Sequence, residues 1–305
     1  MSGALLVDNK LHHEYWRGRG GGATISYDTS AGFEAPEDIY SFGNALDDIA
    51  ATKFRTKSEG VQVRAIITFT NPVTLNGFAV YGHNLSRNQG ITIKYDTDTS
   101  DSVGTGFAGA PHTSSLYGPT DNLYTPFGAT FDTPITGIKR LQITTHNWNP
   151  NNFISILSAG MWLKTNIDIS TPFIPPSFTT YESAIKKNVK GDPFTSDVTK
   201  VPQKIQINLQ QFSEDDLYSQ TDPAQLTSIN GLESHHGFVD YLGYFMSQYP
   251  FFFMYNKGLA TDSTAQQRAD QQKLYFCTIN GGLKQPSYSS PTLLNWKISA
   301  IGYMR

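Results

Sequence analysis

The chain has 305 residues, a formal net charge of −3 and a charged fraction of 16%, below the roughly 25% of ordinary soluble proteins. Its basic residues are scattered, so the sequence lacks the clustered positive charge of a nucleic-acid-binding surface, and we expect no nucleic-acid partner. No stretch approaches the roughly 18 apolar residues of a membrane helix, and the N-terminal residues lack a secretion signal, so no membrane insertion is expected.

The length indicates more than one folding unit. A chain of 305 residues exceeds what one hydrophobic core usually serves. Residues 170–177 hold three prolines, which favour an extended spacer over a helix or a central strand. We therefore predict a first domain over residues 1–165, a Pro-rich linker over 166–177 and a second domain over 178–305.

The first domain has the alternating pattern of antiparallel strands. Residues 61–69 and 91–95 alternate apolar and polar side chains, which is the period of half-buried strands, and residues 139–145 repeat it. Between the first two runs, Asn71-Pro72 and Asn76-Gly77 are turn dipeptides, so a succession of short strands is predicted. The pattern predicts a mainly β fold that begins with an N-terminal β-sandwich jelly roll.

The long stretch at 97–131 is rich in Gly, Ser, Thr and Pro and lacks sustained periodicity. We interpret it as surface loops, where recognition in a sandwich usually takes place. Farther along, Trp148 lies between Asn147 and Asn149. Sugar sites combine an aromatic ring with hydrogen-bonding amides, so these three residues are candidate glycan contacts.

Two segments resemble a known family. FAVYGHNLS (78–86) ends an apolar strand in Gly-His-Asn-Leu, and ISILSAGMWL (154–163) is an apolar strand broken by a glycine. Together they resemble the discoidin-like, or galactose-binding-like, β-sandwich modules of bacteriophage tail and baseplate proteins. The resemblance implies a virion structural protein and offers no catalytic residues. We expect His83 of the Gly82–Leu85 turn to be a structural hydrogen-bonding residue.

The second half has a different order of elements. Residues 204–209 alternate as a strand, and apolar residues recur at helical spacing over 233–248 before Pro250 ends the run. Three more strands are predicted at 251–255, 273–279 and 294–300. This order predicts a smaller C-terminal β-sandwich or barrel domain with one flanking helix.

Three consecutive aromatic residues, Phe251, Phe252 and Phe253, place at least one ring on the outer face of their strand. An exposed aromatic ring favours contact with a neighbouring subunit. The three residues are therefore a candidate assembly surface. The second domain is expected to self-associate, while the first stays monomeric and faces outward.

Candidate metal ligands are few. The acidic loop at 96–101 offers alternating oxygen ligands for calcium, but Asp101 and Phe107 depart from the EF-hand pattern, so a solvated loop is expected. Adjacent histidines on a helix point about 100° apart, so His235-His236 do not converge on one ion. His12-His13 are expected in a mobile terminus. No cofactor is predicted, and calcium in the loop is the alternative.

No constellation predicts catalysis. Glu214-Asp215-Asp216 follows a strand, where a charged run is usually solvated. Cys277, the single cysteine, excludes an internal disulfide, and its place in an apolar strand predicts a buried inert thiol. Residues 18–23 match G-x-G-x-x-A, but no strand precedes them and no helix follows, as a dinucleotide site requires. We predict a protein that is not an enzyme.

Two functions stay open. The first is a structural component of a bacteriophage virion, in the tail tip, baseplate or neck. Such a protein is made in the host cytoplasm and assembles with other tail or baseplate proteins as a symmetric homo-oligomer. The alternative is a carbohydrate-binding adhesin that recognises host-surface glycans through the loops at 97–131 and 146–150. A glycoside-active enzyme is supported least, because the sequence does not locate a pair of catalytic carboxylates.

Overall fold

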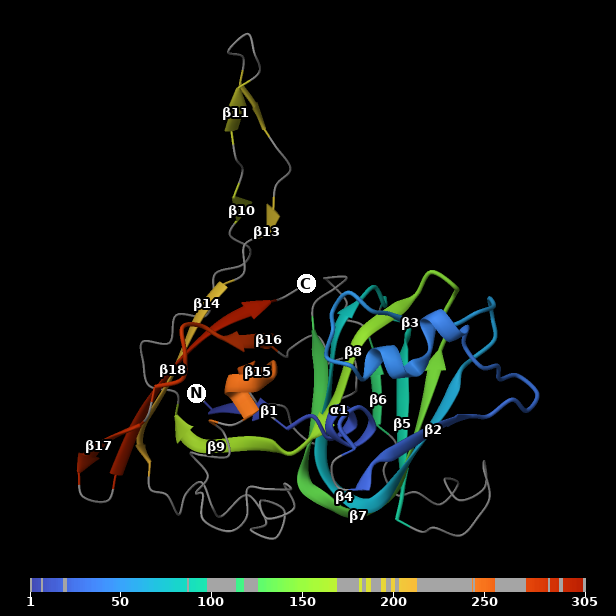
Figure 1. Ribbon diagram of the computed structural model, residues 1–305, viewed down its shortest axis with the longest axis horizontal. Helices are drawn as coiled ribbons and strands as arrows, with labels where there is room; N and C mark the ends of the chain where they lie inside the picture. The colour runs from blue at the N-terminus through green and yellow to red at the C-terminus, as the bar shows by residue number, and fades with distance from the viewer. Residues whose placement is uncertain are drawn as a thin grey trace.

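The computed structural model describes the chain in several stretches. They are residues 2–6, 8–18, 21–86, 88–97, 114–117, 126–168, 181–182, 185–187, 193–195, 199–200, 203–212, 243, 245–255, 273–284, 286–290 and 293–303. Within them the fold is mainly β, with two seven-stranded antiparallel sheets and short helices (Figure 1). None of the helices described there is long and apolar enough to cross a membrane.

The first sheet folds over on itself to make a sandwich. Its strand order is β3-β8-β4-β7-β5-β6, with β2 paired to β4. The strands are β2 (Ala23–Tyr27), β3 (Phe54–Arg55), β4 (Arg64–His83), β5 (Gly90–Asp96), β6 (Ser114–Tyr117), β7 (Phe127–His146) and β8 (Phe153–Gly160). β4 and β7 are 20 residues long. The first half of β4 pairs with β2 and the end of β7, and its second half pairs with β8 and the start of β7. The two long strands therefore contribute to both layers.

Two predicted turns lie inside β4. Asn71-Pro72 and Asn76-Gly77 were expected to separate short strands, but the strand continues through them with register shifts against β7 between Thr68 and Gly77. Irregular pairing of this kind bends a strand without ending it. Asn76 is buried, and its side chain binds the backbone of Trp162, donating to the carbonyl at 2.9 Å and accepting from the amide. The prediction of turns was wrong because bulges and turns favour the same residue types.

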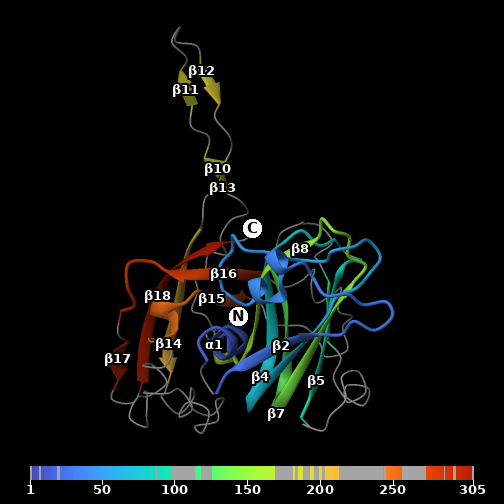
Figure 2. The same cartoon turned by 45° about the vertical axis from the view of Figure 1, so that its right-hand side comes forward.

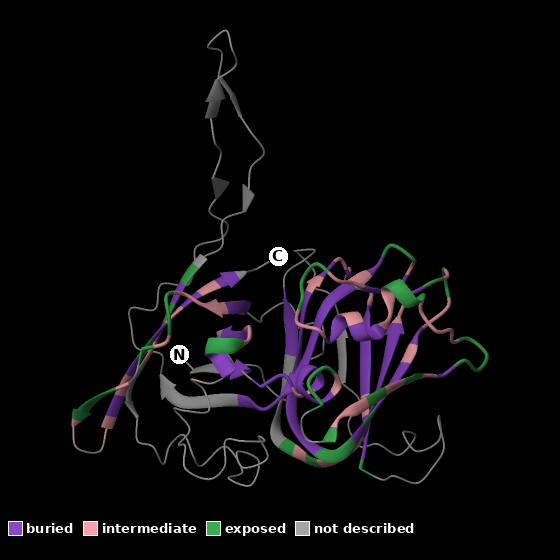
Figure 3. Cartoon of the chain, viewed as in Figure 1, coloured by how far each residue is buried: buried purple, intermediate pink, exposed green. Residues whose placement is uncertain are grey.

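The second half of β4 and its neighbour β8 are buried on both faces. Residues Val73–Tyr81 of β4 are all buried (Figure 3). Phe78 and Val80 point into the sandwich core, whereas Ala79 and Tyr81 belong to a second apolar cluster on the opposite face. A strand with apolar side chains on both faces needs a covering layer on each side. The second sheet supplies the outer cover.

The second sheet has the order β14-β18-β16-β15-β1-β9, with β17 paired to β18. Its strands are β1 (Ser2–Leu6), β9 (Trp162–Asp168), β14 (Gln203–Phe212), β15 (Phe251–Tyr255), β16 (Lys273–Ile279), β17 (Ser287–Ser290) and β18 (Leu293–Tyr303). β9 and β14, at the two ends of this order, lie against each other, so the sheet curls (Figure 1).

The second sheet crosses the boundary predicted between domains 1–165 and 178–305. β1, from the start of the chain, lies between β15 and β9, with Leu5 opposite both Phe253 and Leu163. β9 also takes up the start of the predicted linker, whose residues 169–177 lie outside the described stretches. Within the described residues, β14 to β18 therefore form one curled sheet together with β1 and β9.

The two sheets share a continuous apolar interface. The rings of Tyr81 on β4 and Phe276 on β16 stack at 4.4 Å and 18°. The cluster around them is made of Leu6, Ala79, Ile156, Trp162, Phe252, Met254 and Leu274. Because it draws on both sheets, neither sheet buries this face alone.

Local alternation predicted several strands of this sheet correctly. β15 and β16 have the predicted limits, and β14 and β18 contain the predicted runs. On β18, Trp296 and Ile298 are buried and Lys297 is exposed, as the pattern indicates. Of the helix predicted over 233–248, Phe245 to Gln248 is helical and the rest lies largely outside the described residues.

Four short strands between residues 181 and 200, which we call the hairpin arm, extend away from both sheets (Figures 1 and 2). Its described strands are β10 (Tyr181–Glu182), β11 (Ile185–Lys187), β12 (Pro193–Thr195) and β13 (Thr199–Lys200). β10 pairs with β13 and β11 with β12, in two small ladders that belong to neither large sheet. Sequence analysis did not predict this arm.

The shared interface makes a measurable prediction. Tyr81→Ala and Phe276→Ala should each lower the free energy of unfolding by about 3–5 kcal/mol, as truncation of a buried aromatic ring does. Together they should cost about 0.5–1.5 kcal/mol less than the sum, because each removes the same ring contact. Urea unfolding measures all three values. Phe42→Ala with Phe276→Ala is the control pair, since Phe42 lies in the other cluster, and it should be additive. Additive costs for Tyr81 and Phe276 would contradict direct packing.

Candidate functional site

The predicted glycan contacts form a closed turn. Trp148 is 3% exposed, packs in the sandwich core and donates its indole N–H to the carbonyl of Gly90 at 2.8 Å. The side-chain amide of Asn147 donates to the carbonyl of Asn88, and the side-chain oxygen of Asn149 accepts from the amide of Asn151. The buried ring presents no face to a sugar, so this assignment is corrected to a structural one.

The predicted assembly surface is internal. Phe251, Phe252 and Phe253 are each 1–2% exposed. Phe252 faces the sandwich within the cluster that joins the sheets, and alternation turns the other two toward the opposite, concave side of the sheet. The ring of Phe252 does pack at an interface, but this interface is with the sandwich of the same chain.

The first residue of the predicted calcium loop, Asp96, forms an ion pair with Arg140. Asp96 ends β5 and is buried, and its carboxylate accepts from Nε of Arg140 at 3.2 Å and also from Nη2. The guanidinium compensates the negative charge of the carboxylate, so no metal ion is needed to do so. Residues 98–101 lie outside the described stretches. Across the residues that the structure does describe, no three His, Cys, Asp or Glu side chains are grouped to hold a metal ion.

The Gly-His-Asn-Leu turn has a structural role, as predicted for its histidine. His83 is fully buried, its Nδ1 accepts from the amide of Leu85 at 3.1 Å, and its ring contacts Phe127. Gly82 has φ +66°, and a Cβ there would meet the side chain of Ser155 at 2.9 Å. Both the backbone angle and the contact explain why glycine occupies this position.

Among the remaining predicted residues, those that the structure describes have structural surroundings. Cys277 is buried, as predicted, and its burial raises the pKa of the thiol far above the usual value. Gly18, Gly21 and Gly22 have positive φ and belong to a loop. This agrees with the rejection of a dinucleotide-binding motif at residues 18–23. Glu214 to Asp216 and His235-His236 lie outside the described residues.

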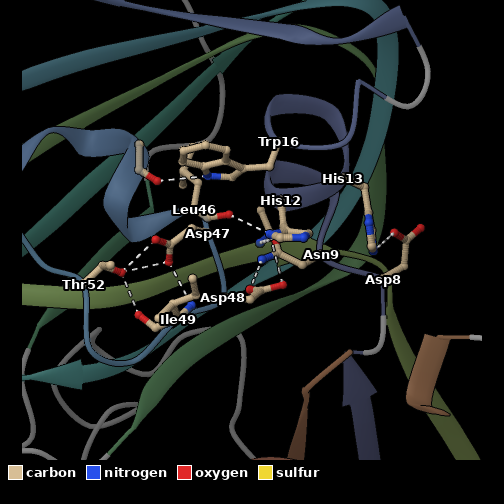
Figure 4. Close-up of polar contacts among 12 residues, drawn as sticks. Asp8, Asn9, His12, His13, Trp16, Leu46, Asp47, Asp48, Ile49 and Thr52 are labelled. Atoms are coloured by element: carbon tan, nitrogen blue, oxygen red, sulfur yellow. Dashed lines mark hydrogen bonds and ion pairs between the residues drawn. The ribbon is translucent and has the colours of Figure 1, made fainter. Parts of the chain in front are cut away.

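His12 and His13 are part of a buried polar cluster, which corrects the prediction of a mobile terminus. Both lie on α1 (Lys10–Tyr15), a short helix next to β8. The α1 cluster, as we call it, consists of Asp8, Asn9, His12, His13, Glu14 and Asp48, whose side chains are buried. Figure 4 shows all of them except Glu14. Asp48 is distant from the histidines along the chain, so the sequence gives no sign that it lies beside His12.

Asn9 and His12 attach α1 to the sandwich. His12 Nδ1 lies 3.0 Å from the carbonyl oxygen of Leu46 and 3.4 Å from Oδ2 of Asp48. A carbonyl only accepts, so this nitrogen carries the proton. The Asn9 side chain donates to Oδ1 of Asp48 at 2.8 Å and accepts from the amide of Ala159 on β8 at 3.2 Å. Asn9 is the N-cap residue of α1, yet its side chain bridges other elements instead of capping the helix.

His13 attaches α1 to the segment that precedes β15. Its Nε2 lies 3.6 Å from Oδ1 of Asp8, and its ring contacts Tyr249 at 4.7 Å and Phe245 at 5.0 Å. Asp8 is also paired with Lys10 at 2.6 Å. A Cβ at position 160 would lie 2.1 Å from the Asp8 carbonyl oxygen, so Gly160 permits the close approach of the cluster to β8.

Two carboxyl groups of the cluster bind protons more tightly than usual. Burial raises the pKa of Asp48 to about 7, against a lowering effect of the Asn9 hydrogen bond. Burial likewise raises the pKa of Glu14 to about 7, partly offset by Lys10. The His–Asp pairs are enclosed, so the arrangement is suited to fastening α1 and holding protons, not to meeting a substrate.

Comparisons with known proteins concern the sandwich. No protein-family model and no curated protein matches the sequence. An F5/8 type C domain from Bacteroides fragilis is 20% identical, with a TM-score of 0.30 over 45% of this chain and 89% of that one. A family 32 CBM of C. perfringens NanJ, in complex with galactose, is 14% identical, with a TM-score of 0.33 over 52% and 98%.

A third similar structure is much longer than this chain. It is a Ruminococcus gnavus GH29 fucosidase in complex with fucose, which is 14% identical, with a TM-score of 0.33 over 46% of this chain. The chain covers about a quarter of the fucosidase, 25%. At these identities the similarity concerns the discoidin-like β-sandwich architecture alone.

Asn9 is expected to be a main fastening of α1. Asn9→Ala removes hydrogen bonds to Asp48 and Ala159 in a buried setting and should lower the free energy of unfolding by about 1–3 kcal/mol. Asn44→Ala is the matched control, since its amide also makes two hydrogen bonds, to Ile39 and Lys53, but within one half-exposed loop. Thermal and urea unfolding should show the smaller loss for Asn44. Equal losses would mean that Asn9 adds no more than a local contact.

Proposed function

We propose that the chain is a structural subunit of a larger protein assembly, which it joins through the hairpin arm. The observation that supports this is the pairing of the arm. β10 pairs with β13 and β11 with β12, and neither ladder pairs with a third strand within the described residues. The arm extends away from the body in both views (Figures 1 and 2).

An arm of this kind is suited to strand pairing with another chain. A lone two-stranded hairpin is marginally stable in water. Both of its edges carry backbone N–H and C=O groups that can pair with an added strand. A neighbouring subunit that pairs with the arm would supply the contacts that the two ladders lack. Phe251 to Phe253, in contrast, are already covered inside the chain.

The identity of the assembly rests on the sequence resemblance. Residues 78–86 and 154–163 resemble modules of bacteriophage tail and baseplate proteins. We infer that the assembly is a virion tail, at the tail tip, baseplate or neck, where the chain meets other tail proteins and copies of itself. The low charged fraction of 16% agrees with large protein contacts.

Shortening the arm tests this function. Residues 183–198 are replaced by Asn-Gly, a dipeptide that closes a two-residue hairpin. We expect the full chain to self-associate in sedimentation velocity at rising concentration and the shortened chain to stay monomeric with an unchanged melting temperature. The control replaces the arm with a Gly/Ser segment of the same length, which keeps the reach of the arm but not its strands. This control should behave as the shortened chain does. A full chain that stays monomeric, or a shortened chain that associates equally well, would contradict the proposal.

Carbohydrate binding is the second candidate, with a different residue at its centre. Trp16 is 50% exposed, whereas the other three tryptophans are buried. Its indole N–H donates to the carbonyl of Gly43 at 3.2 Å, so the ring is held in a fixed orientation. A fixed, exposed ring is the surface on which the apolar face of a sugar stacks.

Titration calorimetry with galactose and fucose tests the second candidate, since these sugars are bound in two of the similar structures. If the sandwich binds either sugar through Trp16, Trp16→Ala should reduce the affinity at least tenfold, whereas Tyr288→Ala should not. Tyr288 is a matched control because it is an exposed aromatic residue on β17. Binding that survives Trp16→Ala, or no binding at millimolar sugar, would remove this site.

A further inference from the structure

The α1 cluster holds more negative than positive groups in a buried space. Asp8 and Glu14 are 2% and 6% exposed, and the Asp48 side chain is 8% exposed. Lys10, next to Asp8, is the mostly buried cation beside them. Removing a carboxylate from water costs several kcal/mol unless a partner compensates it. Three carboxylates and one lysine leave the charge of the cluster uncompensated when all of them ionise.

The hydrogen bonds of Glu14 and Asp48 do not compensate this charge. The Glu14 carboxyl accepts a hydrogen bond from the backbone of Gly22, but its Oε2 is buried and has no hydrogen-bond partner among the residues that the structure describes. Asp48 accepts one short bond, from Asn9 at 2.8 Å, and its other oxygen lies 3.4 Å from His12. A protonated carboxyl group avoids the cost of a buried charge.

The cluster lies where three parts of the fold meet. His12 reaches the loop of Leu46 and Asp48 (Figure 4). Asn9 reaches Ala159 on β8, and His13 reaches Tyr249 ahead of β15. β1 precedes the cluster directly and lies between β15 and β9 in the second sheet. A change of charge here therefore acts on the attachment of α1 to both sheets.

We propose that the α1 cluster is a proton-controlled joint, which holds α1 against both sheets while Asp48 and Glu14 are protonated and loosens when they ionise. The geometry that carries this is the enclosure of three carboxylates at the point where α1, β8 and the β15 segment meet.

The direction of the pH dependence follows from linkage. The pKa of both carboxyl groups is about 7 in the fold, above the ordinary values of 3.8 and 4.5. The folded state then holds more protons than the unfolded state. The stabilisation is fully present below the ordinary values and is lost as the pH rises through about 7.

Other titratable groups lie near these two carboxyl groups and influence their pKa values. Asp47 raises and Arg17 lowers the pKa of Asp48, and Lys10 lowers and Asp8 raises that of Glu14. The titratable groups around the joint are Asp8, Lys10, His12, His13 and Arg17 on the α1 side, Asp47 on the loop and Tyr249 ahead of β15. The experiment leaves all of them in place.

The test compares melting temperatures at pH 5.5 and pH 8 for the full chain and for Asp48→Asn with Glu14→Gln. Asn suits position 48, which has φ +58°, and its side-chain oxygen keeps the bond from Asn9. The unaltered chain should melt several degrees lower at pH 8 than at pH 5.5, and the double variant should lose most of this difference. Glu37→Gln, at an exposed carboxylate, is the control and should keep it.

Either of two results would contradict the proposal of a proton-controlled joint. One is a double variant that keeps the full difference between pH 5.5 and pH 8. The other is an unaltered chain that melts higher at pH 8. If the double variant does not fold, Glu14→Gln alone is measured, and it should reduce the difference by about half; an unreduced difference counts against the proposal in the same way.

Discussion

Burial of the middle layer on both faces is the constraint on which the rest of the structure depends. β4 and β8 carry apolar side chains toward the sandwich core and also away from it. Such a layer has to be covered twice, because either bare face would expose a large apolar surface. The first half of the folded-over sheet covers one face, and the curled second sheet covers the other. The stack of Tyr81 on Phe276 lies at that second interface.

The path of the chain follows from the same requirement. β1 enters the second sheet between β15 and β9, so the first and last parts of the sequence lie in one sheet. α1 and its polar cluster come directly after β1, which explains why buried acids and histidines meet there. The arm, by contrast, is separate from both sheets. In the proposed assembly, the arm would therefore act without disturbing the core, and in the proposed joint the α1 cluster would control how firmly α1 is held.

Sequence reasoning predicted what depends on neighbours along the chain. The mainly β class, the limits of β15 and β16 and the two faces of β18 follow from alternation, which is local. It failed where a distant segment decides the outcome. Asn76 was predicted to be a turn residue, but it lies within a strand and its side chain binds Trp162. Trp148 was predicted to be an exposed sugar contact, but it is buried in the core. Asp48 becomes a partner of His12 only in the folded chain.

Differential scanning calorimetry tests the central claim that the two sheets form one cooperative unit. The account predicts a single transition whose calorimetric enthalpy equals its van't Hoff enthalpy, because neither sheet buries the shared interface alone and β1 and β9 link both halves. Two separate transitions, or a calorimetric enthalpy well above the van't Hoff value, would mean that the halves unfold independently and would contradict it.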